Sequence, residues 1–113
     1  MKPGKYNIVC PQGTTFNTIF TYMINSVPVD LSESSATLIV KEKYTSTNAL
    51  LSISSPANIT LGNDGTIEMN VADEQTSTFK PGTYLYNLDI TEFDGNVVRL
   101  LEGQFIVTPE VTD

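Results

Sequence analysis

The last third of the chain carries two strand patterns joined by a tight-turn signal, and this feature most limits what the chain can fold into. Residues 84–91 alternate large apolar side chains with more polar ones, the period of a strand with one buried face. The predicted inward residues are Tyr84, Tyr86, Leu88 and Ile90. Asp94-Gly95 favours a two-residue hairpin leading into a returning strand at residues 97–108, which Gly103 interrupts. We expect a bulge or a close backbone approach at that glycine.

Six further short segments with strand character precede this hairpin. They are residues 5–10, 15–24, 36–44, 49–54, 58–61 and 66–71. Gly62-Asn-Asp-Gly65 is a second hairpin signal, and residues 72–79 suit one helical turn with Asp73 or Ser77 as its cap. Turn signals at this spacing are typical of a β-sandwich. The pattern therefore predicts an all-β, antiparallel sandwich of about seven to eight strands, formed as a single domain over residues 1–113.

The expected core follows from the same alternation. It includes Cys10, Leu38, Val40, Tyr86, Leu88 and Phe105. Cys10, the only cysteine, is expected to act as a small buried hydrophobe, because no histidine is present to activate a thiol. Five aromatic residues allow two interpretations. They either pack in the core or present exposed rings that form a sugar-stacking platform, as in carbohydrate-binding modules. They are Phe16, Phe20, Tyr22, Tyr84 and Tyr86, and core packing is the more economical interpretation.

Composition argues against several classes of function. The net charge is −7, from 13 acids and 6 bases, so we expect neither nucleic-acid binding nor attachment to an anionic membrane. Without histidine, a Ser-His-Asp or Cys-His catalytic arrangement is impossible. Carboxylate pairs such as Asp89 with Glu92, or Asp64 with Glu68, are interpreted as surface acids. Residues 63–65 with Glu68 offer calcium-type oxygen ligands, but a tight turn needs the same residues. We therefore expect no enzyme, no metal and no cofactor.

Several motifs, in order along the chain, resemble those of small tailed-phage virion proteins. They are residues 5–16 (KYNIVCPQGTTF), 29–31 (VDL), 36–41 (ATLIVK), 59–62 (ITLG), 65–67 (GTI), 82–88 (GTYLYNL), 99–103 (RLLEG) and 109–112 (PEVT). This family is similar to the immunoglobulin-like N-terminal domain of phage upper baseplate proteins. The chain departs from its pattern at Thr14 and at residues 32–35 (SESS), both in expected loops.

The resemblance implies an immunoglobulin-like sandwich that serves as an adaptor or decoration module in the phage tail, baseplate or fibre-attachment region. It implies other virion proteins as partners, many copies in a symmetric assembly, and a location in the virion after synthesis in the host cytoplasm. End loops and edge strands are the expected contact surfaces, above all the predicted loops at residues 25–35 and 92–96 and the termini. Val29 and Leu31 are also expected to pack the first of these loops onto the core. The candidate partner contacts are Val29, Asp30, Leu31, Phe93, Asp94 and Asn96. The alternatives are a head or neck decoration protein and, from another class, a carbohydrate-binding module.

Overall fold

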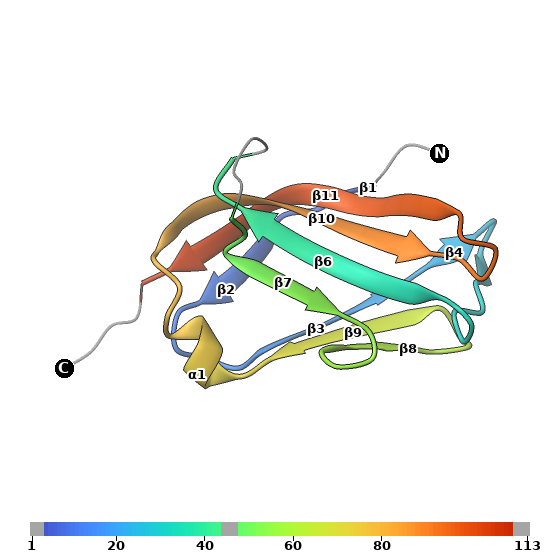
Figure 1. Cartoon of the computed structure of the whole chain (residues 1–113), viewed down its shortest axis with the longest axis horizontal. Coiled ribbons are helices and arrows are strands. Elements are labelled where there is room, and N and C mark those ends of the chain that lie inside the picture. Colours follow the sequence, from blue (N-terminus) through green and yellow to red (C-terminus); the bar gives the residue numbers. More distant parts are fainter. Residues whose placement is uncertain (1–3, 44–47, 110–113) are drawn as a thin grey trace.

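The structure is a computed structural model that describes residues 4–43 and 48–109, and almost all of its regular structure is β (Figure 1). Its described residues form eleven strands and one short helix. The elements are β1 (Gly4–Lys5), β2 (Ile8–Pro11), β3 (Phe16–Thr21), β4 (Met23–Ile24), β5 (Val27–Pro28), β6 (Ser35–Lys41), β7 (Leu51–Ser54), β8 (Ile59–Leu61), β9 (Thr66–Val71), α1 (Asp73–Thr76), β10 (Gly82–Thr91) and β11 (Val97–Thr108). We also expect a polar connection at residues 44–48 and an acidic segment at 110–113; residues 44–47 of the first and all of the second lie outside the described residues.

Two sheets enclose the core, and a small hairpin closes one end. The larger sheet has the order β1-β11-β10-β6-β7, with β2 also pairing with β11, and the smaller has the order β3-β9-β8. Strands β4 and β5 pair only with each other within the described part of the chain. The prediction of a wholly antiparallel fold is wrong at one edge, where β1 and β2 run parallel to β11. Every other pairing is antiparallel.

The alternation predicted from sequence is confirmed in the two central strands. In β10 the four predicted inward residues are buried, and the residues between them are half-buried. In β6 the same pattern buries Ala36, Leu38 and Val40, because successive side chains of a strand point to opposite faces. All six residues predicted for the core are at most 2% exposed. Hydrophobic burial between the two sheets therefore stabilises the fold.

The strand count exceeds the expected seven to eight because two predicted strands are divided and a predicted loop contains one more. The segment expected at residues 5–10 forms β1 and β2, whose partners on β11 lie 97 residues further along in both cases (Gly4 with Leu101, Ile8 with Phe105). β1 and β2 thus form one continuous edge of the larger sheet and keep the same register with β11. Its ladder is interrupted at Asn7, whose side-chain Oδ1 accepts the hydrogen bond of the Gln104 N–H at 3.1 Å.

Gly103 allows a close backbone approach, whereas the bulge of β11 lies elsewhere. The register between β10 and β11 shifts between Leu88 and Asp89, so the extra residue opposite is Leu100 and not Gly103. A side chain at Gly103 would collide with the Tyr6 carbonyl. The Tyr86 hydroxyl, from the residue paired with Gly103, donates a hydrogen bond to that carbonyl at 2.6 Å. The glycine therefore lets Tyr86 attach the β1–β2 edge to the core.

Both hairpins predicted at Asp-Gly are present, but their loops have three residues and not two. The Glu92 N–H still bonds to the Asn96 carbonyl at 2.8 Å, and Gly95 has a φ of 87°. The β8–β9 loop repeats this arrangement, with Gly65 at a φ of 83°. Type I turns followed by a left-handed glycine form loops of this length. In each loop the aspartate also accepts the N–H of the residue two positions later.

The predicted helical turn exists as α1, and of the two predicted cap residues Ser77 is its C-cap whereas Asp73 is not a cap. Asp73 is the first helical residue, Ser77 follows the last, and Ala72 at the N-cap makes no side-chain cap hydrogen bond. Instead, the buried Thr76 hydroxyl donates to the Thr14 carbonyl at 2.6 Å. This contact ties α1 to the turn that joins β2 and β3.

Candidate interaction surface

The acidic residues considered for catalysis or metal binding are engaged in ordinary surface contacts. Asp89 Oδ1 lies 3.1 Å from Arg99 Nε, and Glu68 accepts a hydrogen bond from the Asn17 amide at 3.3 Å. Asp64 accepts hydrogen bonds from Thr66, which lower the pKa of its carboxyl group. Among residues 4–43 and 48–109, no three His, Cys, Asp or Glu side chains gather where they would hold a metal ion. These acids therefore support the surface interpretation.

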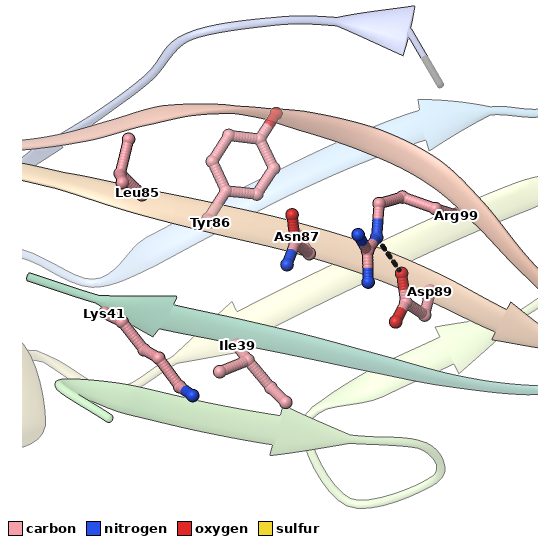
Figure 2. Close-up of a pocket in the computed structure, with 7 residues that line it drawn as sticks. All are labelled: Ile39, Lys41, Leu85, Tyr86, Asn87, Asp89 and Arg99. Carbon is pink, nitrogen blue, oxygen red and sulfur yellow. Dashed lines mark hydrogen bonds and ion pairs between the residues drawn. The ribbon is translucent and has the colours of Figure 1, made fainter. Parts of the chain in front are cut away.

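A hollow of about 240 Å³ lies on the outer face of the larger sheet (Figure 2). Side chains of β6, β10 and β11 line it, and the Asp89–Arg99 ion pair lies at one side. Tyr86 also lines this hollow, but its hydroxyl donates a hydrogen bond to the Tyr6 carbonyl. The other charged residue that lines the hollow is Lys41.

Three loops meet at the end of the sandwich that carries β4, opposite the end that carries α1 (Figure 1). The Leu31 N–H donates to the Gly62 carbonyl at 3.2 Å, which joins the β5–β6 loop to the β8–β9 loop. Asp30 of the β5–β6 loop and Phe93 of the β10–β11 loop line the same shallow depression, so these two loops are also neighbours. We call the resulting surface the β4–β5 end.

Exposed apolar side chains gather at the β4–β5 end. They are Met23, Ile24, Val27, Phe93 and Val97, which are 48–80% exposed. Phe93, at the tip of its loop, is the most exposed of them at 80%. Exposed apolar groups next to one another mark interaction sites more often than isolated ones do.

The same end carries acids and no basic residue in its loops. Its acids are Asp30, Glu33, Asp64, Glu92 and Asp94, while residues 23–34, 62–65 and 92–96 contain no lysine or arginine. Hydrogen bonds from Ser32 lower the pKa of the Asp30 carboxyl. The β4–β5 end thus combines exposed apolar side chains with acidic loops.

The hairpin β4–β5 was missed from the sequence, which predicted a loop over residues 25–35. Ile24 pairs with Val27, so the connecting residues are Asn25 and Ser26, both at positive φ (51° and 66°). This two-residue loop has the signs of φ that a type I′ turn requires. Asn25 is a usual first residue of such a turn, but the glycine that normally follows is replaced by serine.

The structure brings the six predicted contact residues to this one end but gives them different roles. Phe93, Asp94 and Asn96 are exposed, as is Asp30. Leu31 is only 1% exposed and lies in the core, so the prediction that it contacts a partner is corrected. Val29 is half-buried, and its N–H bonds to the Tyr22 carbonyl at 3.0 Å. The buried Leu31 side chain and the Val29 hydrogen bond therefore attach the β5–β6 loop to the body of the sandwich.

The aromatic residues proposed as a sugar-stacking platform lie inside the molecule. Phe16, Tyr22, Tyr84 and Tyr86 are at most 9% exposed, and Phe20 is half-buried. Phe16 packs edge-to-face on Phe105, with 5.7 Å between the ring centroids. A platform needs rings whose faces meet the solvent, so these five do not form one.

Comparisons with known proteins identify a fold and no family. Neither the protein-family models nor the curated proteins gave a match. Among solved structures, 140 chains match, so the fold is widely shared. One is the N-terminal domain of ORF48 of phage TP901-1, with a TM-score of 0.58 and 10% identity over 94% of this chain and 89% of that chain. The chain thus has the fold of a domain of a phage protein. Within the described residues, no helix is long and apolar enough to span a membrane.

Proposed function

We propose that the chain is a structural protein of phage particles that acts through protein–protein contacts and not through catalysis. The observation that carries this proposal is the likeness to the phage TP901-1 domain, which covers 94% of this chain and 89% of the other. The ordered motifs that resemble small tailed-phage virion proteins support the same function independently of the coordinates.

We infer further that the sandwich is of the immunoglobulin-like type. Support comes from the separation into a three-stranded sheet and a larger sheet in which β11 and β10 lie between β1 and β6. A second argument is Tyr84, near the start of β10, whose hydroxyl donates to the Lys80 carbonyl at 2.5 Å. A tyrosine bonded to the backbone a few residues upstream, at the corner leading into a central strand, is a recurrent feature of that fold.

The β4–β5 end is the proposed contact surface for another virion protein. Its exposed apolar side chains supply area to bury, and its acids favour a partner with a basic rim. One such contact is small, so stable attachment would depend on several copies placed symmetrically. The tail, baseplate or fibre-attachment region is the proposed location, with the head or neck as the variant within the same class.

The experiment is quantitative mass spectrometry of phage particles purified by density gradient and washed at high salt. We expect the protein to be retained as a multi-copy component, at a constant ratio to the major tail protein. Its absence from washed particles, while the infected-cell lysate contains it, would overturn the proposal. A glycan array screened with the purified protein tests the carbohydrate-binding alternative, which the burial of the five aromatic residues makes less favourable.

A further inference from the structure

Strand β3 is an open sheet edge without the features that normally protect one. In the described part of the chain it pairs with β9 alone. Its six residues, FNTIFT, include no charged residue, proline or glycine, and its register with β9 is unbroken from Phe16 to Thr21. Natural proteins usually protect exposed edges with lysine, proline, bulges or very short strands.

The other edges of the two sheets show those protective features. β8 has three residues and β7 has four, so each offers a short ladder. The β1–β2 edge is interrupted at Asn7, contains Lys5 and ends at Pro11. The contrast singles out β3 as a strand with the capacity to accept another.

The hydrogen-bond pattern identifies which backbone groups of β3 face outward. The Tyr22 N–H, just beyond the strand, bonds to the Gly65 carbonyl at 2.8 Å and therefore points toward β9. Backbone N–H and C=O groups of successive residues point alternately to the two sides of a strand. Tyr22 points toward β9, so the backbone groups of Asn17, Ile19 and Thr21 point toward the open side. Three successive outward positions provide the donors and acceptors for a new antiparallel partner.

We propose that β3 pairs with β3 of a second copy of this chain around a two-fold axis at Ile19. This register places Asn17 opposite Thr21 of the second copy and Ile19 opposite itself, so every outward position meets another outward position. Identical strands place like residues close together, and a charged edge would therefore repel itself. The β3 edge is neutral, which suits a second copy.

The surroundings of β3 provide apolar area for the same contact. Ile19, Tyr6 and Val9 are 51–57% exposed, and Tyr6 is held beside β3 by an edge-to-face contact with Phe20 at 5.2 Å. Tyr6, Val9 and residues 15–18 line one groove between β2 and β3. A two-fold axis next to β3 would bring the two grooves together and remove these side chains from water. This inference does not depend on whether the chain enters phage particles.

Sedimentation velocity of the full chain over a range of concentrations tests the proposal. We expect a reversible dimer that Ile19→Lys weakens at least about tenfold, because lysine places two like charges at the axis. Val27→Lys is the matched control, since it makes the same change at a similarly exposed apolar residue of the β4–β5 end and should leave the dimer intact. A chain that stays monomeric at high concentration would overturn the proposal, as would equal effects of the two variants.

Disulfide trapping tests the register separately. In a Cys10→Ser background, Ile19→Cys should give a covalent dimer on oxidation, because the axis places residue 19 against its own copy. Asn17→Cys faces residue 21 in this register and should cross-link much less. Cross-linking of residue 17 in preference to residue 19 would contradict the register, and a monomer whose particle incorporation is lost on Ile19→Lys would assign the edge to a strand of another protein.

Discussion

At the scale of single residues, Tyr86 joins the core to the first strands. Its ring is 2% exposed, and its hydroxyl reaches the Tyr6 carbonyl at 2.6 Å. Tyr86→Phe keeps the ring and leaves this carbonyl without its donor. We expect a loss of about 0.5–1.5 kcal/mol in the free energy of unfolding. Urea denaturation at neutral pH measures it, and an unchanged midpoint would show that the hydrogen bond contributes nothing net.

The same residue makes stability depend on alkaline pH. Burial raises the pKa of Tyr86 from 10 to about 12, so the folded chain retains a proton that the unfolded chain releases. The resulting stabilisation is complete below pH 10 and is lost as the pH rises through about 12. Thermal midpoints across this window should fall less steeply for Tyr86→Phe than for the wild-type chain. Parallel curves for the two proteins would contradict this assignment.

Leu88 tests the predicted inward face of β10. Because it is 0% exposed, Leu88→Ala should reduce the free energy of unfolding by about 2–5 kcal/mol through lost burial and a new cavity. Val97→Ala removes apolar atoms from a residue that is 61% exposed and should change stability by no more than about 0.5 kcal/mol. Similar losses in the two variants, measured by chemical denaturation, would contradict the assigned face.

At the scale of elements, the two Asp-Gly hairpins form a matched pair. Gly65 and Gly95 share a left-handed φ, so alanine at either position costs about 1–2 kcal/mol in backbone strain. A side chain at Gly95 would meet open space, whereas one at Gly65 would press on the Tyr22 carbonyl. We therefore expect Gly65→Ala to be clearly the more destabilising in thermal unfolding. Equal losses would show that the β8–β9 loop moves away from Tyr22 without cost.

The sequence predicted most of the strands but missed the direction of one long-range pairing and one short hairpin. Alternation in β6 and β10 was sufficient because each buries one face against the opposite sheet. The parallel pairing of β1 and β2 with β11 joins residues 97 apart, and no local pattern encodes it. The hairpin β4–β5 was missed because serine occupies the position where glycine would have marked the turn.

The candidate site was predicted in the same uneven way. The exposure of Phe93, Asp94 and Asn96 was predicted correctly because a turn signal between two strands predicts an exposed loop. Leu31 was predicted both to pack its loop onto the core and to contact a partner, and the structure confirms the packing, with a side chain that is 1% exposed. Exposure within a loop depends on contacts with other loops, and the local sequence does not encode those contacts. Here the contact is the hydrogen bond from the Leu31 N–H to the Gly62 carbonyl.

At the scale of the whole molecule, apolar exposure is divided between two separate surfaces. Of the eight exposed large hydrophobic residues in the described part of the chain, five lie at the β4–β5 end, and Tyr6, Val9 and Ile19 lie along the β2–β3 side. Only the first surface has a concentration of acids within its loops. If both proposals hold, the neutral side would contact a second copy and the acidic end a different partner, and a small module with two such surfaces could link neighbours in an assembly.

Phe93 is the residue through which the role of the β4–β5 end is best tested. It is 80% exposed at the tip of its loop, and exposed aromatic residues are enriched among interface hot spots. We expect Phe93→Ala to leave the thermal midpoint unchanged and to lower incorporation into particles at least about tenfold, when a plasmid copy complements a phage lacking the gene. Thr83→Ala, an exposed residue of β10 far from this end, is the control and should incorporate normally. Normal incorporation of Phe93→Ala would move the contact away from the β4–β5 end, and equal loss in the control would indicate a defect in folding or expression.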